Sequence, residues 1–493
     1  MQTICRTLLV AAGALLLQSC VGATDLSLPA QPYGMGGLFT RPLIPVEKDT
    51  VTITIRAQLQ GDPGSDVQAQ VDITAPDGRV RQFTVELALS EGTAQGRLQW
   101  KAWLNGLYQV RAQLDPANQV AETDESNNEA QLLLPVVIAG RKPHFPWFGQ
   151  KDYLRWATIW GGGYNKEMVE HWQERGVMPL RWKYGNNYPK PMGEDGFRRM
   201  YSDFGGTEGL AVDECGYYPN TLAGDPKVSK FVDCVRGLAR AKADNPDKFF
   251  LMWHCGTFYP QQAALYRKAC DLVVLESYVS YFAPKGLYTE NAYNFLDMKM
   301  LPARQVDMLN PTGQGPQVIT SIDLRPENFN RGQVESIVRH LRRRWPEMRG
   351  FGIFGGLIPK DATDEQRTRA IADEQFVDRL CYEYFVLPVV TILPGNVWVA
   401  RTDEGGYLVQ AAVSNIGAMD SGPIEVQLHA DGELLKAVAV GEVPAGDSLL
   451  ENRVVVSARW QPASGEHRLS AHISTAQGAT VLDASGEYSY PVM

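Results

Sequence analysis

The feature of this chain that most constrains its fold is a regular alternation of short apolar runs and helical segments between residues 141 and 388. Near-continuous hydrophobicity is typical of strands buried on both faces of a parallel sheet. Seven such strand–helix repeats in about 245 residues approach the eight repeats and roughly 250 residues of a (β/α) barrel. The runs are Trp156–Trp160, Met178–Trp182, Gly209–Asp213, Phe249–Trp253, Leu272–Glu276, Val318–Ile322 and Phe351–Phe354.

An eighth strand is not evident among these runs, and Phe385–Val390 is the candidate that the sequence offers for it. The alternative fold is an open doubly wound sheet, which also alternates parallel strands with helices. No G-x-G-x-x-G follows the first run, which disfavours a dinucleotide-binding version of that fold. We therefore favour the barrel and expect no cofactor.

The segments on either side of the barrel region alternate polar and apolar residues at period two, as Val51–Ala57 does. Turn signals such as Asp77-Gly78 separate these runs. Short strands at this spacing are typical of sandwiches of about 100 residues. The 493 residues are enough for about three domains. We predict a central (β/α)8-type barrel over 141–388, flanked by all-β immunoglobulin-like sandwiches over 43–140 and 389–493.

The end of the first sandwich carries a more specific pattern of acidic residues and asparagines. Side chains of Asp and Asn hydrogen-bond nearby backbone and tolerate left-handed conformations, so they can fix a tight connection before the last strand. The segment resembles the closing signature of the cell-adhesion-related bacterial domain (CARDB), an immunoglobulin-like module. We interpret this cluster as structural, and calcium binding is the alternative. The C-terminal segment, residues 389–493, lacks the paired Asn of the signature. The matching residues are Asp115, Asn118, Val120, Glu122, Asp124, Glu125, Asn127 and Asn128.

The first twenty residues are typical of an export signal. Arg6 precedes an apolar run, Leu8–Leu17, that is too short to cross a bilayer as a permanent helix. Leu17-Gln-Ser-Cys20 then resembles a bacterial lipobox, which implies that residues 1–20 carry a lipoprotein signal peptide, cleaved before Cys20, and that Cys20 is acylated. The alternative is a plain secretory signal. Residues 21–42, rich in Gly and Pro, are predicted to be a linker.

These features predict an exported bacterial lipoprotein of the cell envelope, on the periplasmic or surface side of the outer membrane. Val21 follows the cysteine, so no Asp is there to favour retention in the inner membrane. The formal net charge of −9 disfavours nucleic acid as a partner. The dense basic run Arg339, Arg342, Arg343 and Arg344 is interpreted as a solvated helix face. Five cysteines follow Cys20 without a C-x-x-C spacing, which disfavours zinc and leaves disulfide pairing open.

Polar residues stand at the carboxyl ends of the predicted strands, where the active sites of such barrels form. Asp213 and Glu214 end one apolar run, and Glu276 ends another. Successive strand residues point to opposite faces, so only one of the adjacent pair can face the barrel mouth. Salt bridges to nearby Arg and Lys residues are the alternative role for these acids. The predicted substrate-binding residues are Trp160, Arg181, Trp182, Lys183, Tyr217, Trp253, His254, Tyr278 and Asp323.

Two carboxyl groups on separate strands are what glycoside cleavage requires, one protonated and one ionised. Aromatic rings near the strand ends can stack on the C–H faces of sugars. In strand order and acidic strand ends, the region resembles (β/α)-barrel glycoside hydrolases, which implies a carbohydrate polymer as substrate. We take Glu214 and Glu276 as the leading pair, with Asp213 as support or substitute. In the well-known retaining clan of these enzymes, an Asn precedes the acid/base Glu. In this chain Asp213 precedes Glu214, so we do not transfer that clan's residue roles.

A second hypothesis is a non-catalytic surface lipoprotein that binds glycans or mediates adhesion, with protein contacts through its sandwiches. Fold alone does not decide between the two. A metal held by His254 with Glu214 and Glu276 is disfavoured, because no H-x-H or H-E-x-x-H spacing is present. The G-x-S-x-G motif of the nucleophile elbow is absent, which disfavours an α/β-hydrolase. The placement of the three carboxylates distinguishes the enzyme from the binding protein.

Overall fold

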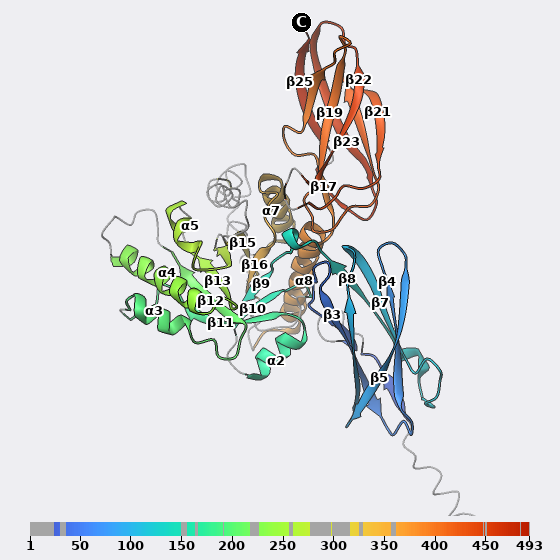
Figure 1. The fold of residues 1–493 in the computed structure, drawn as a ribbon, viewed down its shortest axis with the longest axis vertical. Coiled ribbons are helices and arrows are strands. Elements are labelled where there is room, and N and C mark those ends of the chain that lie inside the picture. The colour runs from blue at the N-terminus through green and yellow to red at the C-terminus, as the bar shows by residue number, and fades with distance from the viewer. Residues whose placement is uncertain are drawn as a thin grey trace, which may run out of the picture. The chain divides into compact units, whose positions relative to one another are not determined.

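The computed structural model divides into two compact units, one ending at Val136 and the other beginning at Val137, and each is described by itself (Figure 1). It describes residues 24–29, 36–148, 155–162, 166–190, 192–216, 226–255, 260–276, 297, 316–324, 329–355, 361–446, 448, 451–483 and 485–492.

The first unit is an antiparallel all-β sandwich whose strands follow the order β1-β3-β6-β5-β4-β7-β8, with β2 also paired to β3. Alternate residues of each strand enter the core; in β4, for example, Val67, Ala69, Val71 and Ile73 are buried. This is the alternation that predicted the domain. The strands are β1 (Asp25–Ser27), β2 (Leu38–Arg41), β3 (Thr50–Gln60), β4 (Val67–Thr74), β5 (Val80–Ser90), β6 (Thr93–Lys101), β7 (Gly106–Leu114) and β8 (Glu129–Val136).

This sandwich begins before residue 43, so the predicted linker 21–42 is wrong as a structureless tether. Strands β1 and β2 both lie within it and pair with β3. Leu26 and Leu38 are buried against the core of the sandwich, which explains why these short strands form. With three and four residues they are too short to show periodicity in the sequence.

The acidic signature bonds to backbone, as the structural interpretation expects. The Asp115 carboxylate accepts a hydrogen bond from the Val120 amide at 2.7 Å, and Glu122 accepts one from the Leu26 amide, also at 2.7 Å. Asp115 and Asn118 have φ of 37° and 51°, the left-handed conformation that these residue types tolerate. The acidic residues therefore fix the loop that leads to β8, and Glu122 also binds the backbone of β1.

The predicted signal peptide, Cys20 included, lies outside the described residues. Within the described part of the chain, no helix combines the length and the apolar composition needed to cross a bilayer. The five cysteines after Cys20 are free thiols, and the sulfur atoms of Cys215 and Cys234 lie 3.6 Å apart.

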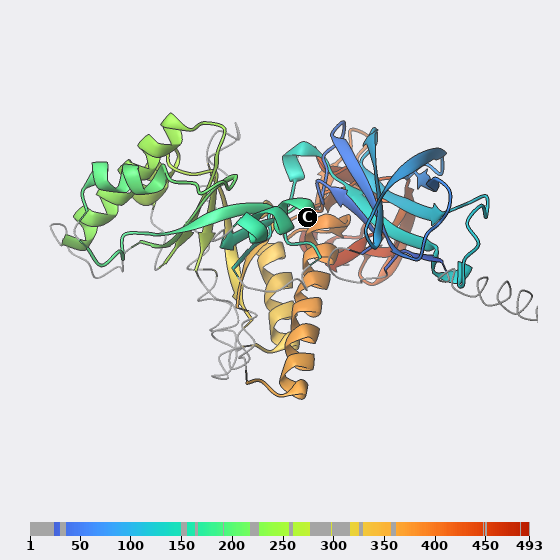
Figure 2. The ribbon, with the colours of Figure 1, turned by 90° about the horizontal axis from the view of Figure 1, so that it is seen from below.

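The second unit contains a closed barrel of eight parallel strands, in the order β10-β11-β12-β13-β14-β15-β16-β9. Helices follow the strands along the chain, and α7 and α8 lie side by side (Figure 2). The strands are β9 (Pro146–Phe148), β10 (Ile159–Gly162), β11 (Met178–Tyr184), β12 (Gly209–Cys215), β13 (Phe249–His254), β14 (Leu272–Leu275), β15 (Gln317–Asp323) and β16 (Phe351–Phe354). The described helices are α2 (Lys166–Glu174), α3 (Glu194–Tyr201), α4 (Pro226–Asp244), α5 (Pro260–Tyr266), α7 (Arg331–Arg344) and α8 (Asp364–Cys381).

Closure of the barrel confirms the predicted architecture and excludes the open sheet, but the eighth strand is not Phe385–Val390. The missing strand is β9, which precedes the other seven and pairs with both β10 and β16. Phe385 lies in the π-helical segment η4 (Tyr382–Val386), and Val390 belongs to the next domain. A three-residue strand that begins with proline carries too little pattern to be recognised.

The strand register sorts side chains into those that face the barrel interior and those that face the helices. Phe148 and Trp253 come from opposite strands of the closed sheet, yet their ring centroids lie 4.5 Å apart, so both point inward. Paired residues of parallel strands share a face, which places Ala211 and Leu251 inside as well. A Cβ on Gly352 would collide with Trp253 and Val274, so glycine is required there.

Residues from Val389 onward form a second all-β sandwich with its own buried core. One sheet has the order β18-β19-β17-β24 with β22 paired to β19, and the other has the order β21-β20-β23-β25. The strands are β17 (Val389–Thr391), β18 (Val397–Arg401), β19 (Tyr407–Asn415), β20 (Ile424–Ala430), β21 (Glu433–Val440), β22 (Arg453–Trp460), β23 (Gly465–Ala476), β24 (Thr480–Asp483) and β25 (Ser485–Val492).

The interpretation of the basic run as a solvated helix face is wrong for Arg342. Arg343 and Arg344 are exposed, whereas Arg342 is 1% exposed. Its guanidinium donates hydrogen bonds to the carbonyl oxygens of Tyr384 at 3.0 Å and Pro346 at 3.1 Å, and also to those of Met348 and Ile416. Because Ile416 belongs to the C-terminal sandwich, this one side chain joins α7 to that domain. Burial lowers the pKa of Arg342 to about 9.

Candidate active site

The carboxyl end of β12 is a bulge that separates two adjacent acids. The register against β13 shifts between Val212 and Cys215, and Glu214 has a φ of 50°. Asp213 pairs with Tyr184 on the interior face and is partly buried, whereas Glu214 is exposed. Bulges re-aim side chains in this way. One acid of the pair therefore faces the interior, and the other leaves the regular strand.

The surroundings of Asp213 favour its protonated form. Burial, and then the negative charge of Glu214, raise the pKa of Asp213 to about 6. A side-chain hydrogen bond from Trp182 acts in the opposite direction without cancelling this shift. A carboxyl group of this kind can hold a proton in weakly acidic solution and give it up to a substrate atom.

The backbone beyond β13 lies between the ends of β12 and β14. Cys255 follows β13, and burial together with the charges of Glu276, Glu214 and Asp213 raises the pKa of its thiol to about 12. The backbone hydrogen bonding of the sheet continues past both strand ends. The Cys255 amide donates a hydrogen bond to the Cys215 carbonyl at 3.0 Å, and the Glu276 amide donates one to the His254 carbonyl at 2.8 Å. The three predicted carboxylates thus stand at the carboxyl ends of β12 and β14, on either side of β13.

Spacing between the strands sets the scale of this arrangement. Strands β12 and β14 flank β13, so their backbones are two strand spacings apart, roughly 10 Å. Side chains that project toward the barrel axis approach one another more closely than that. The arrangement suits two carboxyl groups on either side of one bond.

Three of the predicted substrate-binding residues share the interior face. Trp182 is partly exposed beside Asp213, and Asp323 is fully buried at the end of β15. Trp253 is 1% exposed and packs on Phe148, so it belongs to the core of the barrel.

Four other predicted residues lie on the helix-facing side, where a substrate in the barrel mouth would not touch them. Trp160 stacks on Trp172 of α2 at 5.4 Å. Arg181 and Lys183 pair with Asp203, the latter at 3.0 Å. The sequence indicates that a residue lies at the end of a strand, but it does not show which face of the sheet the side chain occupies. For this reason the sequence analysis grouped these four residues with those of the interior face.

The fourth is His254, which is fully buried between β13 and α5. Its Nδ1 lies 2.7 Å from the Tyr266 hydroxyl. We place it with the structural contacts of the helix layer. Tyr217 and Tyr278, the remaining two predicted residues, lie outside the described residues.

A loop after β11 supports the acidic strand end, and the sequence analysis did not identify it. The Gly185 amide donates to the Asp213 carbonyl at 2.6 Å, and the Asn187 side chain donates to the Glu214 carboxylate. Asn186 exchanges two hydrogen bonds with the backbone of Gly216, at 2.7 and 2.8 Å. The signal for this loop is Gly-Asn-Asn directly after a predicted strand, a typical turn composition.

Replacing Gly185 with alanine is expected to lower the free energy of unfolding by about 1–3 kcal/mol, because an added methyl group in a closely packed place forces the backbone to shift. A Cβ at this position would collide with the backbone of Asp213, Glu214 and Cys215. Gly441→Ala is the matched control, since its Cβ would meet no atom within 4 Å. Urea unfolding of the two variants tests this, and equal stability would show that the close approach is unimportant.

Comparisons with known proteins come at two levels, whole chain and single domain. No curated protein matches the sequence. A Bacteroides uniformis β-glucuronidase is similar with a TM-score of 0.32 and 12% identity, covering 95% of this chain and 62% of that one. A Paenibacillus sp. cycloisomaltooligosaccharide glucanotransferase is similar with a TM-score of 0.34 and 10% identity. The match covers 96% of this chain and 72% of that one. The chain thus spans about 62% of the glucuronidase's length, and these similarities are weak.

At the level of one domain, the crystal structure of a CARDB domain from Pyrococcus furiosus, in complex with di-metal ions, is 19% identical and covers 24% of this chain and 90% of its own, with a TM-score of 0.18. The CARDB family model itself matches residues 39–132. This match includes the signature segment and agrees with its resemblance to the CARDB family.

Proposed function

We propose that the barrel is a glycoside hydrolase that cleaves a polysaccharide with Asp213 and Glu276. The observation that carries this proposal is that three carboxylates stand at the carboxyl ends of two barrel strands, β12 and β14, on either side of β13. One of them has a pKa raised to about 6. A carboxyl group whose pKa lies near the working pH is suited to act as a general acid.

In this proposal Asp213 donates a proton to the leaving oxygen, and the ionised Glu276 acts from β14 as nucleophile or as base for water. Trp182 holds Asp213 in place through its hydrogen bond. Glu214 is exposed and bonded to Asn187, so its role is to keep a negative charge beside Asp213. The proposed pair therefore differs from the Glu214–Glu276 pair that the sequence favoured.

The pH dependence follows from the raised pKa of Asp213. A proton donor must be protonated in the free enzyme, so kcat/KM should fall as pH rises through about 6. Glu214→Gln removes a charge that raises this pKa and should move the alkaline limb to lower pH. The measurement is kcat/KM against pH for both proteins. A limb that stays in place in the variant would contradict the assignment of Asp213 as the acid.

The proposal is tested with protein that begins at Val21, assayed for new reducing ends on a panel of soluble polysaccharides. Hydrolysis by the wild type that is lost in Asp213→Asn and in Glu276→Gln would support it. Binding without hydrolysis on every polysaccharide would favour the second candidate, a surface protein that binds glycans. Equal hydrolysis by all three proteins would remove the proposed pair.

We further propose that acylation of Cys20 anchors the protein in the cell envelope, where an extracellular polysaccharide would be accessible. The lipobox-like segment before Cys20 supports this. Labelling cells with an alkyne fatty acid tests it: the wild type should be labelled and Cys20→Ala should not. Label retained by the variant would contradict the anchor.

A further inference from the structure

We propose that Trp182, Tyr184 and Tyr188 form an aromatic row that binds successive sugar units of a polysaccharide outside the barrel mouth, ending in a hollow beside α3. The inference deepens the proposed function, on which it rests for the cleavage of the bound chain. It adds where the polymer lies: over the β11 end of the barrel and along the loop that follows.

The three rings form a continuous series that starts at the proton donor. The Trp182 side chain bonds to Asp213. The ring centroids of Trp182 and Tyr184 lie 4.3 Å apart, and those of Tyr184 and Tyr188 lie 5.6 Å apart. A chain bound along the row would therefore lead directly to the reacting bond.

The rings are accessible although the backbone beneath them is held firmly. Tyr184 is 42% exposed, and a residue that served only the core would be buried. Its carbonyl accepts a hydrogen bond from the Tyr201 hydroxyl at 2.9 Å, and Lys230 donates to the carbonyl of Tyr188. The Tyr188 amide bonds back to Gly185 at 3.2 Å. A site fixed before binding loses less conformational freedom when a ligand arrives.

The row ends in an open hollow of about 960 Å³, at the upper end of the roughly 300–1,000 Å³ that small-molecule sites occupy. Its lining combines Tyr188 with the apolar side chains of Met192 and Met200 and the charged side chains of Glu194 and Arg199. It therefore offers apolar and polar groups side by side.

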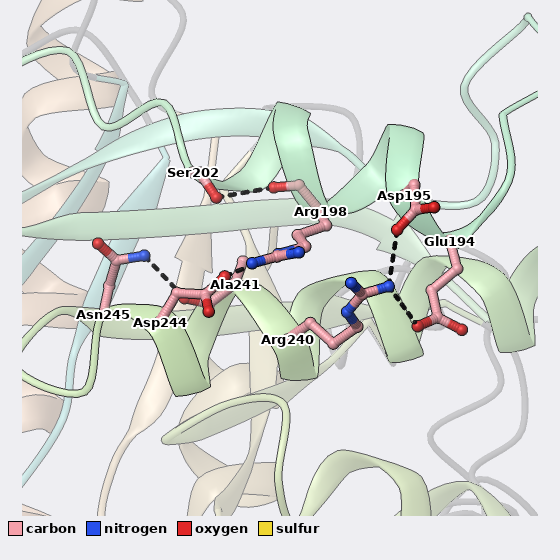
Figure 3. Close-up of polar contacts among 8 residues, drawn as sticks. All are labelled: Glu194, Asp195, Arg198, Ser202, Arg240, Ala241, Asp244 and Asn245. Atoms are coloured by element: carbon pink, nitrogen blue, oxygen red, sulfur yellow. Dashed lines mark hydrogen bonds and ion pairs between the residues drawn. The ribbon is translucent and has the colours of Figure 1, made fainter.

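The floor of this hollow is rigid because α3 is tied to α4. Figure 3 shows Arg198 pairing with Asp244 at 2.7 Å, and Arg240 pairing with Glu194 at 3.1 Å and Asp195 at 2.7 Å. Helix α3 also packs its buried Phe197 and Tyr201 underneath. The hollow is thus held by both helices.

The chemistry of the row favours a carbohydrate as its occupant. Neighbouring ring planes are inclined by 69° and 56°, so the rings do not form the flat apolar patch that marks a protein interface. A sugar chain presents an apolar C–H face and a polar rim at each unit, and it can turn between units. Rings that meet at an angle beside charged groups match that pattern.

The experiment measures binding in the Asp213→Asn background, so that the polymer is not consumed. Affinity electrophoresis through soluble xylan, mixed-linkage β-glucan, dextran and pullulan gives a dissociation constant for each variant. Tyr184→Ala and Tyr188→Ala should each weaken binding to the retarding polysaccharide about tenfold. Tyr184→Phe and Tyr188→Phe, which keep the rings, should bind as the parent does.

Tyr488→Ala is the matched control, because Tyr488 is 40% exposed and lies on β25 of the C-terminal sandwich. Its binding should equal that of the parent. Three outcomes would overturn the inference. They are unchanged retention of both alanine variants, a loss of retention in Tyr488→Ala alone, and no retention of the parent on any polysaccharide. Ring-dependent binding without hydrolysis by the wild type would keep the aromatic row and remove the proposed hydrolase, so the two failures are distinguishable.

Discussion

Asp213→Asn is expected to lower kcat on the polysaccharide by about 10²–10⁴-fold, the range that a positioned general acid contributes. Asparagine keeps the size of the side chain and its bonding to Trp182 but cannot give up a proton. Glu276→Gln should cause a loss of similar size, because its ionised form is required across the bond. Initial rates of reducing-end release, measured at pH 5 to 7, give both values.

Glu214→Gln is the matched control for these two variants. It lies next to Asp213 in the chain, but its side chain is exposed and held by Asn187. We expect a loss of less than about tenfold at the optimum pH, since only a neighbouring charge is removed. If Glu214→Gln lost as much activity as Asp213→Asn, the pair inferred from the sequence would replace the one proposed from the structure.

Arg342→Ala is expected to lower the free energy of unfolding by about 3–5 kcal/mol, because each buried acceptor left without its hydrogen bond costs about 1–3 kcal/mol and such costs add only in part. The variant would leave four carbonyl oxygens without the guanidinium that satisfies them. It would also remove the contact with the Phe385 ring, whose centroid lies 4.6 Å from the guanidinium carbon. Urea unfolding followed by tryptophan fluorescence measures the change.

Two further variants separate this contact from a general effect of charge. Arg343→Ala, one residue along α7 and exposed, should change stability by less than about 0.5 kcal/mol. Arg342→Lys keeps the charge but lacks the planar fork, so it should lie between the wild type and Arg342→Ala. Equal stability of the alanine variants at 342 and 343 would contradict the structural role of Arg342.

Composition patterns predicted the elements whose burial is uniform along their length. Seven of the barrel strands contain a short apolar run, such as Leu272–Leu275, because a strand between a filled interior and a helix layer is buried on both faces. The strands of the N-terminal sandwich alternate because only one of their faces is buried. Strands β1, β2 and β9 have three or four residues each, and their place depends on partners far along the chain, so no local pattern marks them.

The acids of the candidate site were recognisable because a carboxylate at the end of an apolar run is costly unless it is solvated or paired. That reasoning named Asp213, Glu214 and Glu276 but not the role of each. The bulge at Glu214 is a shift of register between β12 and β13, and the loop that carries Asn187 bonds to the end of β12. Such contacts have no trace in either segment alone.

By itself, the order of residues determined the longer strands, the helices and the places where acidic groups interrupt apolar runs. Closure of the sheet decided which side of each strand faces the interior, and so separated Trp182 and Asp213 from Arg181 and Lys183. Packing of α7 against the C-terminal sandwich decided that Arg342 is buried while Arg343 beside it is exposed. Local patterns encode periodicity, whereas the face that a side chain presents depends on partners that only the folded chain brings together.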